Sequence, residues 1–478
     1  MLDDLVKTMD RAEGHCEYAE ARRVLQAGEH LVTRNGEVES VDVLETDGIG
    51  VRVRCGGAWG FASAREPTAA GAEAALRRAL DVARSLPGAA GTPLAPVAPA
   101  RGHWDGPCEE DPFAVPLERK VALLLAADEA MRGDPRIAVV QGSVLAMRTT
   151  RAFASTAGAA CTQTLTECGG GIEATAVGGK EIQTRSYPGT HEGGVAAAGW
   201  EHAESLDLVG QAPRVAEEAI ELLMAPECPS GTETIVLHGE QLALQLHESI
   251  GHALELDRIL GDEAAYAGTS WVKPEDLGTL RYGSELLDVT ADATVPGGLG
   301  TFGWDDEGVP AQRFPLVASG RLVAALSSRE SAAAIGLPAS GGCARAEGHT
   351  RQPIVRMTNV SIEPGDAGSL DDLIAATDRG LYLETNRSWS IDDRRLHFQF
   401  GVQLAREIRG GKLGRVLRNA SYAGVTPEFW ASLDAVCGPD EWRLWGVLNC
   451  GKGEPGQLMH VSHGTSPARF VDVQVGVA

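Results

Sequence analysis

Two histidines and a glutamate stand close together in the segment LALQLHESIGHALELD, residues 242–257. Imidazole nitrogens are common ligands of divalent transition metals, and a carboxylate beside them can take a proton from water. This combination predicts metal-assisted hydrolysis. The spacing is unusual, because His247 and His252 are five residues apart, whereas metal-binding helices of the HExxH type place them four apart.

The spacing decides whether both rings can face one ion. On a regular α-helix the two side chains would point about 140° apart, which favours a helix whose histidines have different neighbours. A π-turn of about 4.4 residues would bring both rings back to one side, and such turns occur preferentially at functional sites. Gly251 makes that distortion easier. Spacing alone leaves both interpretations open.

A catalytic zinc site needs a third protein ligand and an open position. Glu255 and Asp257 follow the histidines, but carboxylates in this place are commonly partners of a ligand or solvated. Cys450, in LNCGKGEPGQ, is another candidate, because the following glycines expose the thiol and Lys452 favours the thiolate. Taken alone, it could equally be an ordinary turn cysteine. Four further potential ligands have no role that the sequence assigns: His238, Cys343, His460 and His463.

A helix must position the two histidines. Apolar residues recur every four positions at Leu242, Leu246, Ile250 and Leu254, which predicts a helix that starts near Glu240. The rest of the second half is mostly β-structure. Its alternating or β-branched segments lie at 232–237, 316–326, 353–362, 380–386, 396–414 and 468–477.

The first half mixes helices and strands. An acidic amphipathic helix opens the chain, strands follow, and the stretches RNGE and CGGAWG are typical of hairpin turns. Helices are expected near 69–85, 116–132 and 204–224, with β-structure between 136 and 188. The Pro/Ala/Gly stretch at 86–102 is interpreted as an extended surface loop.

These segments predict an α+β protein of two domains. With 478 residues the chain exceeds the size at which a single core keeps growing. The boundary is expected at APECPSGT, 225–232, after a long helix and before a new strand. We expect an N-terminal α+β domain, 1–228, that serves assembly or substrate enclosure. A β-rich C-terminal domain, 229–478, would carry the metal-binding helix.

Composition narrows the range of partners. The chain has 42 basic and 66 acidic residues, a net charge of −24, which repels phosphate backbones and anionic lipid surfaces. Its longest apolar run, VALLLAA at 121–127, is far shorter than the roughly 18 residues of a membrane span. The first residues lack the basic region of an export signal. We therefore expect a cytoplasmic protein with reduced cysteines and neither nucleic acid nor membrane as a partner.

Five motifs in the second half carry a resemblance to a known family: HESIGHALELD, VRMTNV, GLYLETN, FQFGVQLAREIRGGKLG and CGKGEPGQ. In this order they closely resemble the TldD branch of the TldD/PmbA (TldE) metallopeptidases. The stretches YAEARRV, GIGVRV and WGFAS match less specifically, so the resemblance covers essentially the whole chain. In that family the HExxxH histidines and a C-terminal cysteine bind the metal, and the glutamate is the catalytic base. The resemblance assigns these roles to His247, His252, Cys450 and Glu248.

The resemblance implies a zinc-dependent peptidase with one ion per chain, or another divalent transition metal, acting on short, unfolded or modified peptides. A substrate peptide could lie along a sheet edge of the β-rich half. The family also implies a dimer, either with a second copy or with a TldE/PmbA-like paralogue that lacks the histidines. Two alternatives remain. One is a non-catalytic assembly subunit with a structural metal, which has no use for Glu248, and the other is a cysteine hydrolase with Cys450 as nucleophile.

Overall fold

The computed structural model describes residues 2–86, 91–190 and 194–476. Residues 87–90 of the expected connector and Val477 of the last expected strand lie outside them. Helices and strands are mixed throughout, so the α+β prediction is confirmed.

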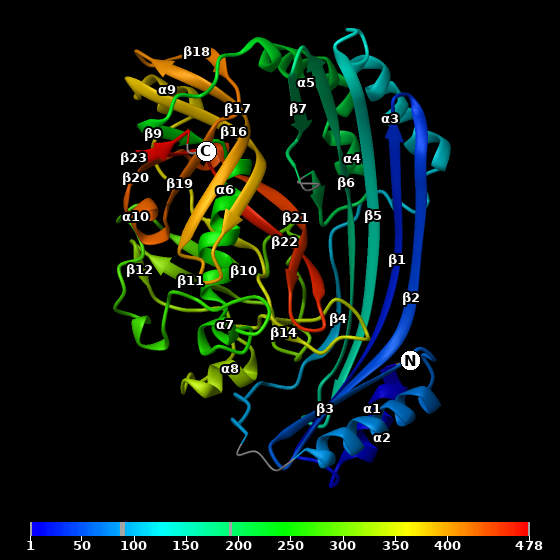
Figure 1. The fold of residues 1–478 in the computed structure, drawn as a ribbon. Helices are drawn as coiled ribbons and strands as arrows, with labels where there is room; N and C mark the ends of the chain where they lie inside the picture. Colours follow the sequence, from blue (N-terminus) through cyan, green and yellow to red (C-terminus); the bar gives the residue numbers. More distant parts are fainter. Residues whose placement is uncertain (1, 87–90, 191–193, 477–478) are drawn as a thin grey trace.

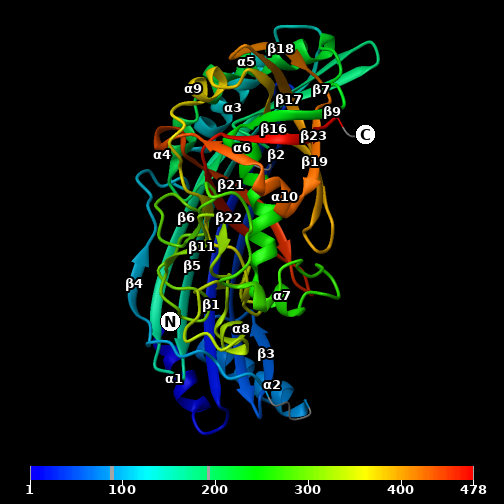
Figure 2. The same ribbon diagram turned by 90° about the vertical axis from the view of Figure 1, so that its left-hand side faces the viewer.

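A sheet of long strands dominates the first half (Figure 1). The order is β3-β2-β1-β5-β6-β4, with β7 and β8 also paired to β6, and every pair is antiparallel except β4 with β6. The bounds are β1 Tyr18–Arg34, β2 Glu37–Cys55, β3 Ala58–Ala64, β4 Arg101–Asp105, β5 Ile137–Ser155, β6 Ala160–Gly178, β7 Glu181–Tyr187 and β8 Val195–Ala196. In the side view the longest strands run beside the C-terminal half for most of its length (Figure 2).

Both expected hairpin turns are present. Asn35 and Gly36 join β1 to β2 with φ angles of 53° and 82°, and Gly56 and Gly57 join β2 to β3 with 59° and 79°. Left-handed conformations at both central residues match the right-handed twist of the flanking strands. Asparagine and glycine adopt them at low cost, so the local sequence fixes these turns.

Two groups of helices cover the two ends of the long sheet (Figure 1). The first is α1 Leu2–Ala12 with α2 Ala69–Ser85, and the second is α3 Leu117–Met131, α4 Trp200–Ser205 and α5 Leu208–Met224. The single helix expected over 204–224 is wrong at its start. Asp207 takes a left-handed conformation, φ 49°, and its carboxylate accepts a hydrogen bond from the Gly210 N–H, so a new helix begins there.

The main sheet of the second half closes on itself. Strands β16-β9-β23-β19-β17 pair in that order and β17 pairs back to β16, while β18 and β20 add to β17 and β23. The bounds are β9 Gly231–Leu237, β16 Arg379–Ile391, β17 His397–Arg409, β18 Lys412–Leu417, β19 Ser421–Val425, β20 Leu433–Val436 and β23 Ala468–Val475. The side chains of this ring and of α6, Gly239–Leu246, share the largest hydrophobic core.

Smaller elements complete the second half. The short sheets contain β10 Val289–Asp292, β11 Arg313–Ala318, β12 Arg321–Leu322, β13 Ala344–Arg345, β14 Ile354–Val355, β15 Val360–Ile362, β21 Arg443–Lys452 and β22 Gln457–Thr465. The remaining helices are α7 Leu256–Leu260, α8 Arg329–Ala334, α9 Leu370–Ala375 and α10 Thr426–Ala431. The expected strand segments therefore contain strands, several of them shorter than predicted.

Buried charges join the two halves in what we call the junction network: Glu20, Arg22, Arg52, Asp306 and Glu307. The Arg52 guanidinium lies 2.9 Å from Glu20 on β1 and 2.8 Å from Glu307 in the second half. Arg22 lies 3.4 Å from Asp306. Each side chain is at most 8% exposed, so these pairs are shielded from solvent.

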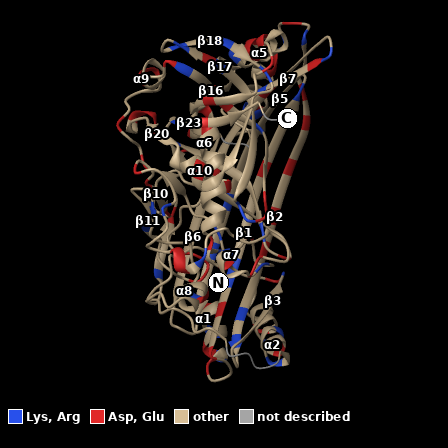
Figure 3. Cartoon of the chain, turned by 60° about the vertical axis from the view of Figure 1, so that its left-hand side comes forward, with Lys and Arg blue, Asp and Glu red and all other residues tan. Residues whose placement is uncertain are grey.

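Elsewhere acidic and basic residues are interspersed along both halves of the chain (Figure 3). Among the described helices none combines the length and the apolar composition needed to cross a lipid bilayer. The cytoplasmic location itself stays a prediction.

Candidate metal centre

Three potential metal ligands predicted from the sequence meet inside the second half. One donor atom each of His247, His252 and Cys450 lies within 4.8 Å of the other two, and all three residues are buried. Among the described residues no other group of three or more His, Cys, Asp or Glu side chains has this arrangement.

A π-turn aligns the two histidines. After α6 the chain forms a π-helix over His247–Gly251 and a 3-10 turn over His252–Leu254 before α7 begins. The ring centroids of His247 and His252 are 4.7 Å apart. The π-turn hypothesis is confirmed, and the alternative of two rings with different neighbours is wrong. A regular helix over the whole stretch is also wrong.

Gly251 is needed for a reason that the spacing did not reveal. A Cβ atom at this position would lie 2.1 Å from Sδ of Met357, which belongs to a neighbouring segment of the core. The glycine therefore allows the π-turn to pack closely against Met357, in addition to easing the backbone distortion.

Hydrogen bonds fix which nitrogen of His247 is available. Nδ1 of His463 lies 2.8 Å from the carbonyl oxygen of Val360, which can only accept, so that nitrogen carries the proton. Nε2 of His463 is then an acceptor, 2.7 Å from Nδ1 of His247, which must donate. The lone pair of His247 that remains is on Nε2. Metal-binding histidines in general are oriented in this way, by a hydrogen bond that the second ring nitrogen donates to a neighbouring acceptor.

A carboxylate plays the corresponding part for His252. Oε2 of Glu255 lies 3.0 Å from Nδ1 of His252, which leaves Nε2 of that ring 3.6 Å from Sγ of Cys450. For a tetrahedral zinc ion with ordinary bond lengths, the nitrogen-to-sulfur edge is about 3.5 Å. The donor set therefore fits zinc without rearrangement of this pair.

The protonation states also suit metal binding. Burial lowers the pKa of His247 to about 4 and lowers the pKa of His252. Burial makes the pKa of His463 fall well below its usual value as well. All three rings are thus neutral at pH 7, and a neutral ring is the form that can bind a metal.

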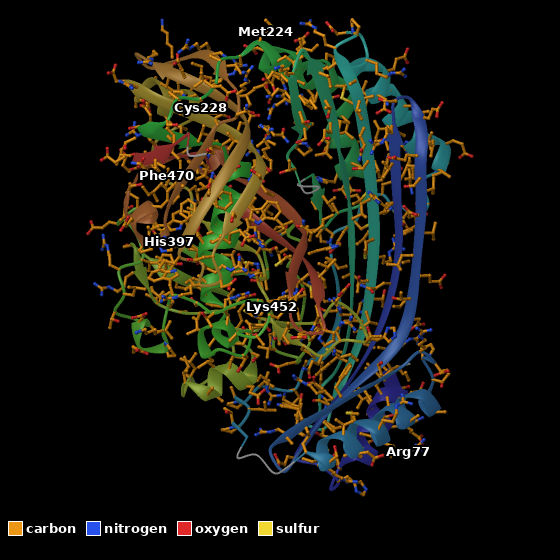
Figure 4. All side chains as sticks on the ribbon, viewed as in Figure 1. Arg77, Met224, Cys228, His397, Lys452 and Phe470 are labelled. Carbon is orange, nitrogen blue, oxygen red and sulfur yellow. The ribbon has the colours of Figure 1, made fainter. Side chains whose placement is uncertain are left out.

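Glu255 and Asp257 lie beside the candidate ligands, with a lysine between the two carboxylates. Nζ of Lys452 is 3.4 Å from Glu255 and 2.7 Å from Asp257. Burial alone would raise the pKa of Glu255, but the charge of Lys452 and the contact with His252 hold it well below its usual range. Lys452 is among the largest fully buried side chains and lies inside the second half (Figure 4). Glu255 thus bonds to a candidate ligand, which is one of the two environments expected for it.

The surroundings of Cys450 differ from the prediction. The residue lies within β21 opposite Met459 of β22 and is 2% exposed, so the predicted exposure of the thiol is wrong. Burial would raise its pKa, but the charge of Arg356 and the contact with His252 outweigh burial and lower it. Lys452 is engaged with the carboxylates, and Arg356 is the cation that favours the thiolate.

Glu248 lines a cavity of about 480 Å³ together with the three ligand candidates. Strand β16 contributes Trp389, Ser390 and Ile391 to its wall, and β21 contributes residues 447 and 449–451. One oxygen of Glu248 forms an ion pair with Arg395, from the turn between β16 and β17. A carboxylate in this place can accept a proton from a water molecule in the cavity.

The other unplaced residues have different surroundings. His238 begins α6 with its ring against Trp445, Cys343 is buried in the core, and His460 bonds to Glu167 on β6 at 2.5 Å. His463, by contrast, supports His247. The sequence offers His463 as a potential ligand without a role. It does not single out Arg356, in VRMTNV, or Arg395, in no motif, because a lone arginine carries no metal-binding pattern.

Models of three parts of one family match the chain. The PmbA/TldA metallopeptidase C-terminal domain matches residues 230–476, domain 1 matches 19–83, and the central domain matches 110–225. The matches to domain 1 and to the central domain thus divide the first half of the chain into two parts. The predicted division into 1–228 and 229–478 stays a prediction.

Similar proteins include a metalloprotease from Methanothermobacter thermautotrophicus, 31% identical over 466 residues, 97% of this chain and 96% of that one. A zinc metalloprotease TldD homolog from Saccharolobus solfataricus is 25% identical over 248 residues, 52% of each chain. The crystal structure of TldE from Thermococcus kodakarensis superposes with a TM-score of 0.75 at 15% identity and covers 99% of this chain and 100% of its own. The last likeness shows the fold alone.

Proposed function

The chain belongs to the PmbA/TldD family of metallopeptidases, and on that premise we propose that it is a zinc-dependent peptidase of the TldD type. In this proposal His247, His252 and Cys450 hold one zinc ion per chain, and Glu248 is the general base. The relatives support a metal-dependent peptidase, and one of them is named for zinc.

The observation that carries the proposal is the convergence of the donor atoms of these three residues beside a cavity that Glu248 also lines. A structural zinc site is usually closed by four protein ligands, whereas a catalytic site keeps one position open. The three-donor set and the adjacent carboxylate therefore support catalysis over a non-catalytic assembly subunit.

The residues divide the work of amide hydrolysis. A zinc ion, when bound, supplies the Lewis acidity that makes water a nucleophile at neutral pH. Glu248 accepts the proton of the attacking water and passes it to the nitrogen of the leaving amine. The hydrogen bonds that Nδ1 of His247 donates to His463 and Nδ1 of His252 donates to Glu255 keep the two imidazoles in one orientation and one tautomer throughout.

We propose short or unfolded peptides as substrates. Among the described strands β21 pairs only with β22, and residues of β21 and β16 line the cavity, so an extended peptide could bind beside them through its backbone. A folded protein offers an unpaired backbone only in rare open states. Modified peptides remain within this class, because backbone pairing places few demands on side chains.

We also propose a dimer, either of two copies or with a TldE/PmbA-like paralogue. The proposal is supported by the TldE fold likeness and by the first half, which adds a long sheet but no metal-ligand cluster among its described residues. Mass measurement in solution, with and without a candidate partner, checks this point.

The decisive experiment measures zinc content and peptide digestion together. Zinc-loaded protein should cleave a denatured protein and leave its native form intact, and a chelator should abolish cleavage until zinc is restored. Cleavage that survives complete metal removal but is stopped by iodoacetamide would favour the cysteine hydrolase. Equal digestion of native and denatured substrate by a monomer would overturn the proposed selectivity.

A further inference from the structure

Arg395 is the one positively charged side chain on the cavity side of the candidate metal centre. Among the described residues that line the cavity, it is the only lysine or arginine. Its guanidinium pairs with Glu248, and its side chain is 16% exposed. Its buried Nε has no hydrogen-bond partner among the described residues. The guanidinium therefore has at least one N–H group, on Nε, that is not used in a hydrogen bond and lies close to the proposed base.

The other cations near the ligands are engaged elsewhere. Lys452 is held by Asp257 and by the carbonyl oxygen of Val355, both at 2.7 Å. Arg356 donates to the carbonyl oxygens of Cys450 and Gln457. Neither Lys452 nor Arg356 is among the described residues that line the cavity. Of the three cations, only Arg395 can contact a molecule bound there.

The backbone holds Arg395 in a conformation that arginine rarely adopts. Its φ is 61°, in the left-handed region. The turn is fixed because the Arg395 N–H donates to the carbonyl oxygen of Asp392 at 2.9 Å and the Thr426 hydroxyl donates to the carbonyl oxygen of Arg395 at 2.7 Å. Local strain of this kind persists where surrounding contacts enforce it, commonly at functional sites.

The proposed reaction creates a negative charge that the ligands and the base do not neutralise with hydrogen bonds. Two imidazoles with their N–H groups turned away, a thiolate and a carboxylate offer no donor to the cavity. When water adds to the peptide carbonyl, the π electrons move onto its oxygen. Preorganised donors at this oxygen are usually a large part of catalysis.

We propose that Arg395 is a catalytic residue that donates hydrogen bonds to the scissile carbonyl oxygen as it becomes an oxyanion. This inference rests on the proposed function. The water oxygen bonds to the carbonyl carbon, and the water proton goes to Glu248. Collapse re-forms the carbonyl, breaks the carbon–nitrogen bond and transfers the proton from Glu248 to the amine. The guanidinium is unchanged at the end.

The test compares zinc-loaded full-length protein with Arg395→Ala, Arg395→Lys and, as a matched control, Arg394→Ala. Arg394 precedes it in the same turn and is exposed. Arg395→Ala should lower kcat about 10²–10³-fold, with KM and zinc content nearly unchanged. Arg394→Ala should match wild type, and Arg395→Lys should fall between. Added guanidinium ion at low concentration should restore part of the activity of Arg395→Ala but none of that of Glu248→Gln.

Binding of a phosphinic peptide, a stable mimic of the tetrahedral anion, tests the same idea without turnover. Arg395→Ala should weaken its binding far more than it weakens binding of the parent peptide. Unchanged kcat, zinc loss in the variant, or equal weakening of both ligands without rescue would each overturn the inference. Metal-independent hydrolysis by wild type would instead overturn the proposed function, so the two failures are distinguishable.

Discussion

The candidate metal centre and the junction network are both clusters of buried ionisable side chains, yet they differ in what remains unbonded. In the junction network Arg52 faces Glu20 and Glu307 directly, and Arg22 faces Asp306. In the candidate metal centre His463 and Glu255 engage one nitrogen of each histidine ring and leave the other nitrogen facing the cluster. Two nitrogens and one sulfur therefore converge, with Nε2 of His252 3.6 Å from Sγ of Cys450.

Buried charge alone is thus a poor guide to function in this molecule. The opposite charges of Arg22 and Arg151 outweigh the effect of burial on Asp306 and lower its pKa, as expected for a structural ion pair. Burial of the ligand rings, by contrast, lowers their pKa values and keeps them neutral and available. The difference predicts that substitutions in the two clusters change different quantities.

The largest effect is expected from Cys450→Ser. Loss of the thiolate removes the softest ligand, so zinc content should fall sharply and peptidase activity with it. Elemental analysis of the purified variant checks this, with Cys228→Ser as a control because Cys228 lies outside the donor cluster. Full zinc occupancy in Cys450→Ser would remove this residue from the site and direct attention to Glu255.

Glu248→Gln should separate chemistry from metal binding. The amide cannot accept the water proton at neutral pH, so kcat should drop about 10²–10⁴-fold while zinc content stays at one per chain. Glu454→Gln, at an exposed position in the β21–β22 turn, makes the same change away from the cavity and should leave kcat unaltered. Near wild-type turnover in Glu248→Gln would leave the mechanism without a base.

A smaller effect is expected from His463→Gln, which disturbs the orientation of His247. Loss of such a supporting hydrogen bond typically costs about 10–100-fold in metal affinity or activity. Zinc competition titration should show this weakening. His460→Gln lies on the same strand but bonds to Glu167, so its zinc affinity should match wild type. Equal affinities for both variants would contradict the support role.

The smallest effect on the metal centre is expected from Arg52→Met in the junction network. Two buried carboxylates would lose their shared cation, so the free energy of unfolding should fall by about 3–5 kcal/mol. Zinc content should not change. Urea unfolding and elemental analysis measure the two quantities. Arg136→Met, which breaks an exposed pair with Asp134, should leave the free energy of unfolding nearly unchanged. Zinc loss in Arg52→Met would show that the two clusters are coupled.

Local sequence patterns determined most of the elements. The periods of apolar residues located α2 and α3 to within a residue, and Asn35-Gly36 fixed a hairpin turn. The five-residue spacing of His247 and His252 was enough to suggest a π-turn, because two rings can share an ion only if the helix widens there. These inferences succeeded because neighbours in the chain interact through geometry that their spacing sets.

Tertiary structure alone decided the surroundings of these groups. His463 reaches His247 across 216 residues and Arg52 reaches Glu307 across 255, and no local pattern encodes either separation. The same holds for Cys450, because the sequence pointed to Lys452, two residues further along the chain, while the fold placed Arg356 close to the thiol. The amino-acid sequence identifies the candidate donor residues, but strand pairing and core packing determine which of them lie together beside a cavity.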